Sequence, residues 1–416
     1  MSSAFLYLGL LRFAALEEKA RQRQRARKTK AYIKMTRALK TDFYRLRRLS
    51  MDDTSFFKLL AMVRPIMQAD DKDMEEIEVV ELLLLTLKYL ASGCSLEELT
   101  QGCDLSLTEL VKDIPMTCKA IFKALKPYIK FPREEKEWLD IVNDFEKKWN
   151  FNHCAGAFSA RHIAVNKPLE GSEVLLNHKG FHSVLLIAVV NANHEFVYVD
   201  IGTNGGYDQK LILSATGFFG NMIEETINLP KDCPLPASDV AMPYVFLSDA
   251  YYVIENMMRT YPLDNVSCEE KIFNYRFGRA YRVVDDAFGI LYERFGVLQR
   301  NIDVENANDI VIACCALHNY LAKTIINDDY LRKESLDVED VVNYKFQKAS
   351  WRLKEEGLNW DETHPLAAVP QGPEEILDGR GKGVRESFTN YFINQGKVPF
   401  QEQMVNVVPE LQLLTN

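Results

Sequence analysis

The chain has 416 residues, of which 47% are hydrophobic, so it can bury a sizeable core and form two or three domains. No apolar run reaches the roughly 18 residues of a membrane-spanning helix, and the N-terminus does not fit a signal peptide, so we expect neither membrane insertion nor secretion. The net charge is −9, and eight scattered cysteines without a CxxC pair favour free thiols over a zinc ribbon or a disulfide framework.

Residues 1–48 form a basic arm. They hold fourteen Lys and Arg residues against three acidic residues, a net charge of +11, which leaves −20 on residues 49–416. A dense cluster of cations can contact DNA phosphates or serve as a nuclear localisation signal. A solvated charged helix is the alternative for residues 17–30. The acidic remainder would repel a phosphate backbone at long range.

Residues 49–150 are predicted to be helical, because apolar residues recur at three- and four-residue spacing. Residues 96–99, a turn near 102–106 and a helix from Thr108 together suggest a helix-turn-helix. Glu109 and Asp113, however, lie where a recognition helix would present cations, and Pro115 should interrupt the helical hydrogen bonds. We therefore favour packing over DNA binding for this segment.

Residues 151–330 change to short β-type runs separated by turn residues. Helical periodicity returns after Asp249. The order of these elements predicts an α/β layer that begins with an antiparallel meander. The expected strands are 155–165, 183–190, 196–201 and 244–247, and the clearest helices are 279–295 and 309–325.

Residues 331–416 are predicted to be a helical and linker tail. From about Pro365 this tail is richer in Pro and Gly, and it carries Gly-Arg-Gly-Lys-Gly at 379–383. We interpret that stretch as a linker that leads to a short closing segment near residues 388–392.

Three strings resemble those of the PIF/Harbinger transposases, which carry a DDE superfamily endonuclease domain. Residues 156–163, GAFSARHI, resemble the family strand GAIDGKHI. Residues 246–251, FLSDAY, resemble an apolar strand that ends in Asp, a small residue and an aromatic residue. Residues 273–289 resemble FNYRLSRARRVVENAFG. Further strings in the family's order extend the resemblance over roughly residues 50 to 400.

The resemblance implies an RNase H-like mixed sheet flanked by helices, preceded by an all-α region. It also implies a nuclease centre in which three carboxylates hold two divalent ions, Mg²⁺ or Mn²⁺. Asp249 matches the second ligand, and Asp285 takes the place of the glutamate that is the third. Ser159 stands where the family has its first aspartate. The family further implies a Myb-like or MADF-like DNA-binding partner.

The change at the first ligand position decides the predicted activity. Asp285 is shorter than glutamate but remains a hard oxygen ligand, whereas the neutral hydroxyl of Ser159 cannot bridge two dications. We expect cleavage to be severely reduced or absent, with at most a single, weakly bound ion on Asp249 and Asp285. The substitution Ser159→Asp is expected to restore metal affinity.

Two other carboxylates near the centre are not expected to replace the missing ligand. Asp200 should lie on the third strand, about 10 Å from the first, since neighbouring strands are about 4.8 Å apart. Its expected role is to cap the turn at residues 202–206 together with Asp208. Asp286 should project to solvent, because it lies about 100° around the helix from Asp285.

Two further groups of side chains, outside the three ligand positions, each allow a binding role or a structural role. Cys314 and His318 are four apart on a predicted helix and could share a metal ion, but their apolar stripe favours a core helix with a hydrogen-bonded histidine. Side chains that flank the first two strands could contact DNA phosphates or cap the strand ends: Arg161, His162, Lys179 and His182.

The sequence therefore predicts a domesticated transposase-derived protein with a degenerate site at Ser159, Asp249 and Asp285. It would act in the nucleus, with the cytoplasm as a second location, through chromatin proteins or a DNA-binding partner, and its basic arm could contact DNA. The alternative is a divalent-metal-dependent DNA endonuclease with residual activity.

Overall fold

The computed structural model describes residues 49–408 except 73, 102, 104, 208–215, 250–251, 254, 263–265, 326–329, 357–375 and 378. The basic arm, Asp208 and the Pro-containing stretch at 365–375 lie outside the described residues. Among the described helices, none combines the length and the apolar composition that crossing a membrane requires.

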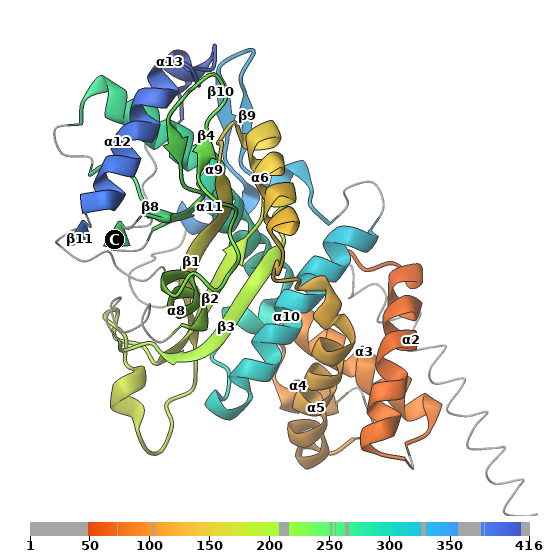
Figure 1. Cartoon of the computed structure of the whole chain (residues 1–416). Helices are drawn as coiled ribbons and strands as arrows, with labels where there is room; N and C mark the ends of the chain where they lie inside the picture. Colours follow the sequence, from red (N-terminus) through yellow and green to blue (C-terminus); the bar gives the residue numbers. More distant parts are fainter. Residues whose placement is uncertain are drawn as a thin grey trace, which may run out of the picture.

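The predicted helical region is present; its helices between residues 53 and 125 gather on one side of the molecule, whereas the helix at 135–149 packs on the central sheet (Figure 1). Apolar side chains such as Phe56, Leu83 and Ile121 are fully buried, which explains the three- and four-residue spacing. Its elements are α2 (Asp53–Asp70), α3 (Glu76–Ser92), α4 (Leu96–Thr100), α5 (Leu107–Leu125), a 3-10 turn (Lys126–Tyr128) and α6 (Glu135–Trp149).

Helix α5 begins at a capping box rather than at a recognition surface. Ser106 caps the backbone N–H of Glu109, and the carboxylate of Glu109 accepts the backbone N–H of Ser106 at 2.7 Å. Helix α5 continues through the buried Pro115, whose nitrogen carries no hydrogen to donate, so one helical hydrogen bond is missing there but the helix does not end. The acidic residue at 109 therefore has a local role in starting the helix.

A five-stranded mixed sheet forms the centre, with the strand order β3-β2-β1-β6-β8. The pairs β1–β2 and β2–β3 are antiparallel, whereas β1–β6 and β6–β8 are parallel. The predicted α/β fold and its leading meander are thus confirmed. The strands are β1 (Cys154–Ala164), β2 (Ser183–Val190), β3 (Phe196–Asn204), β6 (Val245–Ser248) and β8 (Met257–Met258).

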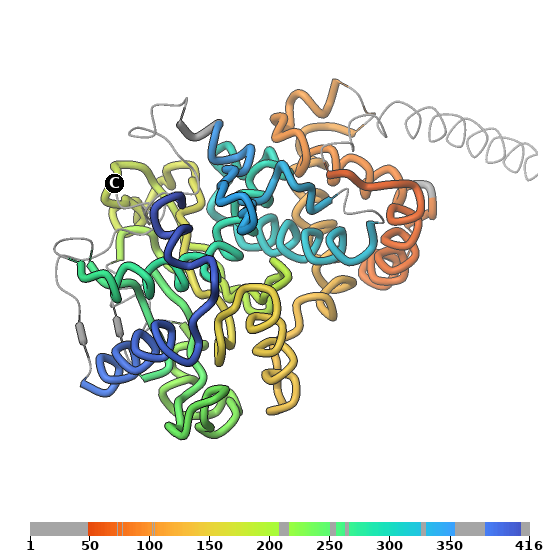
Figure 2. Tube along the Cα trace, turned by 90° about the horizontal axis from the view of Figure 1, so that it is seen from above, coloured from red at the N-terminus to blue at the C-terminus, as the bar shows by residue number. Residues whose placement is uncertain are grey.

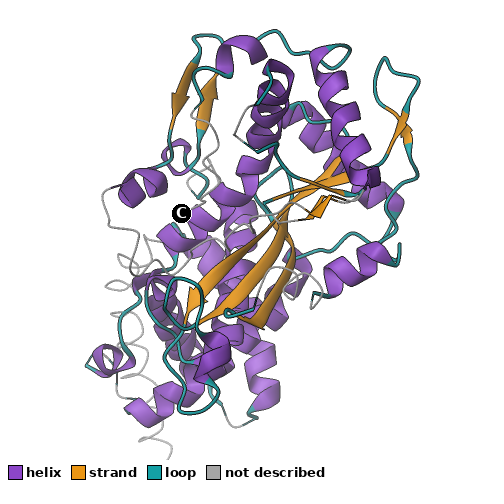
Figure 3. Ribbon diagram, turned by 90° about the vertical axis from the view of Figure 1, so that its left-hand side faces the viewer, coloured by secondary structure: helices purple, strands orange, loops and turns teal. Residues whose placement is uncertain are grey.

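Helices cover both faces of this sheet (Figure 3). Along β1, Ala157 and Ile163 pack into the larger core with α9 and α10, whereas Phe158 packs with Trp138 of α6 and Phe218 of α8. Successive side chains of a strand point to opposite faces, so the odd-numbered positions from 157 to 163 face α9. These helices are α8 (Gly217–Ile223), α9 (Cys268–Arg294) and α10 (Val304–Thr324).

Short pairings surround the main sheet. β4 (Cys233–Pro234) pairs with β5 (Ala241–Met242), and β7 (Tyr252–Val253) pairs with β11 (Ile376–Leu377). The C-terminal elements are β9 (Val338–Asp340), β10 (Lys345–Gln347), α11 (Ser350–Glu356), α12 (Gly379–Ile393) and α13 (Gln401–Met404), with 3-10 turns at Ser172–Leu175, Gly296–Gln299 and Lys333–Ser335.

The C-terminal segment packs on α9 instead of trailing away as a linker. In Figure 2, α12 lies at the opposite end of the molecule from α2. Residues 379–383 were expected to be a linker, but they form the start of α12, whose Phe388 and Phe392 pack on Phe151. Burial of these rings outweighs the low helix propensity of the three glycines.

Candidate functional site

The sheet and α9 bring the three expected site residues together. Ser159 lies on the face of β1 that points to α9, Asp249 directly follows β6, and Asp285 lies on α9. The side chain of Ser159 is completely buried and that of Asp285 is 7% exposed, whereas Asp249 is 16% exposed. The convergence implied by the family motifs is present in the structure.

A guanidinium group lies at the centre of these residues. Arg161, two positions after Ser159 and on the same face of β1, donates from Nη1 to Ser159 Oγ at 2.6 Å and to Asp249 Oδ2 at 3.1 Å. Its Nη2 donates to Asp285 Oδ1 at 2.7 Å. Ser159 Oγ donates to Asp249 Oδ2 at 2.8 Å. One buried cation therefore bridges both carboxylates.

The surroundings of Arg161 keep it charged. Its side chain is 4% exposed, and its guanidinium carbon lies 5.1 Å from the ring centre of Phe288. Burial alone lowers the pKa of Arg161, but Asp249, Tyr281 and Asp285 outweigh burial, so the pKa is raised above its usual value. The pKa of the buried Tyr281 hydroxyl is also raised, first by burial and then by Asp249 and Asp285.

A second arginine binds the other side of Asp285. Arg352 of α11 donates from Nη2 to Asp285 Oδ2 at 3.2 Å and from Nε to Asp337 Oδ2 at 2.7 Å. Both carboxylate oxygens of Asp285 thus accept from guanidinium groups. Burial lowers the pKa of Arg352, and the charges of Asp285, Asp337 and Asp286 reverse this effect. We call these five residues the Arg161 cluster: Ser159, Arg161, Asp249, Asp285 and Arg352.

Sequence reasoning gave Arg161 a different role and missed Arg352. The role of Arg161 could have been predicted, because residues 159 and 161 of a strand point to the same face. Arg161 therefore lies beside the first ligand position and faces the two acidic ones. Arg352 lies 67 residues after its partner Asp285, and no spacing rule connects the two. The expectation that Arg161 meets DNA phosphates or caps a strand end is wrong, since its guanidinium is buried between carboxylates.

Asp286 is fully buried, so the expectation that it faces solvent is wrong. Its Oδ1 accepts the backbone N–H of Asp337 at 3.2 Å, and its Oδ2 lies 3.6 Å from Nε2 of His194. Burial raises the pKa of Asp286, an effect that His194 partly opposes. The cause is the C-terminal segment, which covers the side of α9 that would otherwise face water.

The remaining candidates lie on other faces or strand ends. Asp200 pairs in register with Ile187, which pairs with Ala160, so it is two strands from β1, as expected. Its carboxylate accepts the hydroxyl of Tyr198 at 3.2 Å, whereas Asp208, its expected partner in capping the turn, is not described. Lys179 and His182 lie in the loop before β2, where DNA contact by them stays a prediction.

His162 is buried on the face of β1 opposite Ser159, so it neither caps the strand end nor reaches DNA as expected. Its Nδ1 lies 2.9 Å from Ser183 Oγ. Burial, then His178, Lys179 and Arg161, lower its pKa to about 3. The side chain is therefore a neutral, internal histidine.

His318 confirms the expectation of a buried, hydrogen-bonded histidine. Its Nε2 donates to the carbonyl of His194 at 2.8 Å, and its Nδ1 lies 3.1 Å from the hydroxyl of Tyr330. Burial lowers its pKa to about 4. Cys314 on the same helix is fully buried, and all eight cysteines are free thiols, as predicted.

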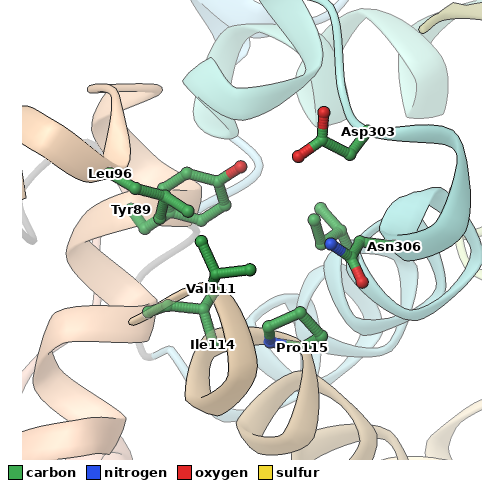
Figure 4. Close-up of a pocket in the computed structure, with 8 residues that line it drawn as sticks. Tyr89, Leu96, Val111, Ile114, Pro115, Asp303 and Asn306 are labelled. Carbon is green, nitrogen blue, oxygen red and sulfur yellow. The ribbon is translucent and has the colours of Figure 1, made fainter. Parts of the chain in front are cut away.

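The helix-turn-helix-like segment packs inward, as favoured from the sequence. Helix α5 contacts α2, α3 and α10, and Leu110, Ile114 and Cys118 are buried. A small depression between α3, α5 and α10 has Tyr89 and Asp303 on opposite sides (Figure 4). Its volume of about 20 Å³ suits a single water molecule.

These residues do not fit a centre for two divalent ions. Mg²⁺ requires several oxygen ligands in a near-octahedral arrangement. Ser159 offers a neutral hydroxyl, and the carboxylates of Asp249 and Asp285 are already paired with buried guanidinium groups. Within the described part of the chain, no group of three or more His, Cys, Asp or Glu side chains is placed to hold a metal ion.

Part of the chain is similar to a known protein family. Residues 160–319 match the family described as DDE superfamily endonuclease. This stretch contains Asp249 and Asp285 and begins one residue after Ser159. No solved structure matches the chain.

Relatives among curated proteins are distant. The chain is 24% identical to the protein ALP1-like of Arabidopsis thaliana over 212 residues, which are 50% of this chain and 52% of that protein. It is 22% identical to the candidate nuclease HARBI1 of Rattus norvegicus and 21% identical to that of Homo sapiens, in each case over 57% of this chain and 65% of the relative. The chain thus spans between half and two thirds of the length of these relatives.

Proposed function

We propose that the chain is a domesticated relative of the Harbinger transposases with a degenerate nuclease centre, a proposal supported by the match of residues 160–319 to the DDE superfamily endonuclease family and by the similarity to ALP1-like and HARBI1. It acts by binding other molecules and not by cutting DNA. The bound molecules are nuclear: chromatin proteins or a Myb-like or MADF-like DNA-binding protein. The basic arm directs the chain to the nucleus or contacts DNA.

The observation that carries this proposal is the guanidinium of Arg161 between Asp249 and Asp285. A divalent ion that used both carboxylates would have to displace this cation and leave it buried without a partner. Breaking a buried ion pair in this way costs about 3 to 5 kcal/mol. That cost corresponds to a loss of roughly a hundred- to several thousandfold in metal affinity.

A nicking assay tests the loss of cleavage. Supercoiled plasmid is incubated with the full chain and Mg²⁺ or Mn²⁺, beside the variant Asp249→Asn. We expect equal, background nicking by both proteins. Nicking by the native chain that disappears in Asp249→Asn would overturn the proposal and favour the alternative, a metal-dependent endonuclease with residual activity. That alternative draws support from the acidic residues retained at positions 249 and 285.

The binding role needs a separate test, because loss of cleavage alone does not imply a new partner. The tagged full chain and a variant that lacks residues 1–48 are expressed in cells, and their location and bound proteins are measured. We expect nuclear enrichment of the full chain and recovery of DNA-binding or chromatin proteins. A full chain that stays in the cytoplasm and recovers neither class would contradict this part of the proposal.

A further inference from the structure

A second group of reactive side chains lies where the two central parallel strands begin. His153 directly precedes β1, Tyr244 directly precedes β6, and Cys233 belongs to β4. The Sγ atom of Cys233 lies 3.5 Å from Nε2 of His153 and 3.2 Å from the hydroxyl oxygen of Tyr244. An imidazole and a phenol hydroxyl therefore lie beside the sulfur atom of the same thiol.

The backbone fixes this arrangement. The carbonyl of His153 accepts the N–H of Val245 at 2.9 Å, and Cys233 pairs with Met242 in the β4–β5 ladder. The rings of His153 and Tyr244 are stacked, with centroids 4.3 Å apart and an interplanar angle of 19°. His153 is 7% exposed and Tyr244 5%, whereas Cys233 is partly exposed. The base is held rigidly, and the thiol is accessible to a small reagent.

We propose that Cys233 is a reactive thiol that forms mixed disulfides with small cationic or neutral disulfides, with His153 as its general base. The Sγ–H proton passes to Nε2 of His153 while Sγ attacks one sulfur of the disulfide. A bond forms between Cys233 Sγ and that sulfur, and the original S–S bond breaks. The leaving thiolate takes the proton from His153, so the products are a mixed disulfide and a free thiol.

The protonation states of the two partners suit this chemistry. Burial lowers the pKa of His153, an effect that the carbonyl groups of Pro243 and Met242 and the charge of Asp232 oppose. The imidazole is therefore neutral near neutral pH and can accept a proton. Burial raises the pKa of Tyr244, and its hydrogen bond with Cys233 raises it further. The phenol thus stays protonated and can donate to the developing thiolate.

The charges around the sulfur select the reagent. Asp232, beside Cys233, and Glu135, on α6, are the charged groups that act on Tyr244, and Asp232 also acts on His153. Both are acidic, so they attract a cationic disulfide and repel an anionic one.

The test follows single cysteines by mass spectrometry after exposure of the full chain to cystamine at about pH 7. Cys94, which is also partly exposed, serves as the matched control. We expect Cys233 to react at least about tenfold faster than Cys94, since a positioned base accelerates proton transfer. Oxidised glutathione should react more slowly than cystamine at Cys233. If Cys233 is no faster than Cys94 with either reagent, the proposal is overturned.

Two variants distinguish the effect of His153 on the reaction rate of Cys233 from the effect of its other neighbours. Asparagine tolerates the left-handed backbone of His153 (φ 58°), so His153→Asn removes the base with little backbone strain. It should bring the rate at Cys233 down to that of Cys94, and Tyr244→Phe should give a smaller decrease. A folded His153→Asn protein that reacts like the native chain would refute the role of His153. If His153→Asn does not fold, the native chain still decides, because the rate ratio of Cys233 to Cys94 must fall as the pH rises from about 6 to about 9.

Discussion

At the scale of single residues, Arg161 determines what the centre can do. It occupies the place between Asp249 and Asp285 where a cation is needed if two acidic side chains are to lie together in a buried site. Ser159 contributes a hydroxyl that accepts from Arg161 and donates to Asp249. The serine and the arginine therefore work as one unit, and a change at either position affects the other.

The substitution Ser159→Asp tests this coupling. The sequence alone predicts that the aspartate restores metal affinity. The structure leads us to expect that it does not, because the new carboxylate would pair with Arg161 at the position of Ser159 Oγ. The double variant Ser159→Asp, Arg161→Ala should bind Mn²⁺ measurably tighter than either single variant. Isothermal titration of the three proteins measures this, and tight binding by Ser159→Asp alone would contradict the account.

Removing the arginine alone should destabilise the fold. Arg161→Ala leaves two buried carboxylates without their shared cation, at a cost of about 3 to 5 kcal/mol in the free energy of unfolding. Lys119→Ala is the matched control, because Lys119 is exposed and its pair with the partly buried Asp309 contributes only about 1 kcal/mol or less. Urea unfolding measures both, and equal effects would count against the buried pair. Mn²⁺ should stabilise Arg161→Ala more than the native chain.

At the scale of elements, α9 is held by the segment that follows it. Arg279 and Arg282 of α9 both bind the carboxylate of Glu339 on β9, whose side chain is 2% exposed. Burial raises the pKa of Glu339, but the two arginines outweigh it and the pKa is lowered. The β9–β10 hairpin and α11 thus form part of the layer that encloses the Arg161 cluster.

The substitution Glu339→Gln is predicted to loosen this layer. It removes the charge that two partly buried arginines share, so we expect a loss of about 3 kcal/mol in the free energy of unfolding. Glu386→Gln, in an exposed pair with Lys382, is the control and should change stability little. Hydrogen exchange of the amides in α9 gives a second readout. Unchanged protection in Glu339→Gln would show that the hairpin does not hold the helix.

Local patterns predicted four strands of the central sheet and the long helices around it, but they did not predict the contacts between segments that are distant in the sequence. The short β-type runs at residues 155–165 and 183–190 identified β1 and β2 within one residue of their bounds, because both strands are buried in the sheet. Asp286 was misplaced because its helix is covered by a segment some fifty residues later, which no helical period reveals. Glycines at 379–383 indicated a linker, whereas packing of Phe388 and Phe392 makes a helix.

At the scale of the whole molecule, buried neutral histidines make stability depend on pH. The pKa of His318 is lowered to about 4 from an ordinary value of about 6.5. The unfolded chain therefore binds a proton that the folded chain cannot, and stability falls as the pH falls from about 6.5 to about 4. The size of this effect is about 3 kcal/mol.

The variant His318→Gln tests the assignment. Glutamine can still hydrogen-bond but does not titrate, so we expect a shallower loss of stability between about pH 6.5 and 4, whatever the overall change at pH 7. Urea unfolding at several pH values measures the slope for both proteins. Identical slopes would mean that other groups, such as His162, account for the acid sensitivity.

The guanidinium of Arg161 differs from a metal ion bound from solution in that every molecule of the protein contains it. Occupancy of a metal centre follows the free ion concentration, and stability contributed by a bound ion follows it as well. The guanidinium of Arg161 is present once in every molecule from the moment of synthesis. The packing of β1, β6 and α9 is therefore independent of metal supply, and chelators should leave the melting temperature of the native chain unchanged.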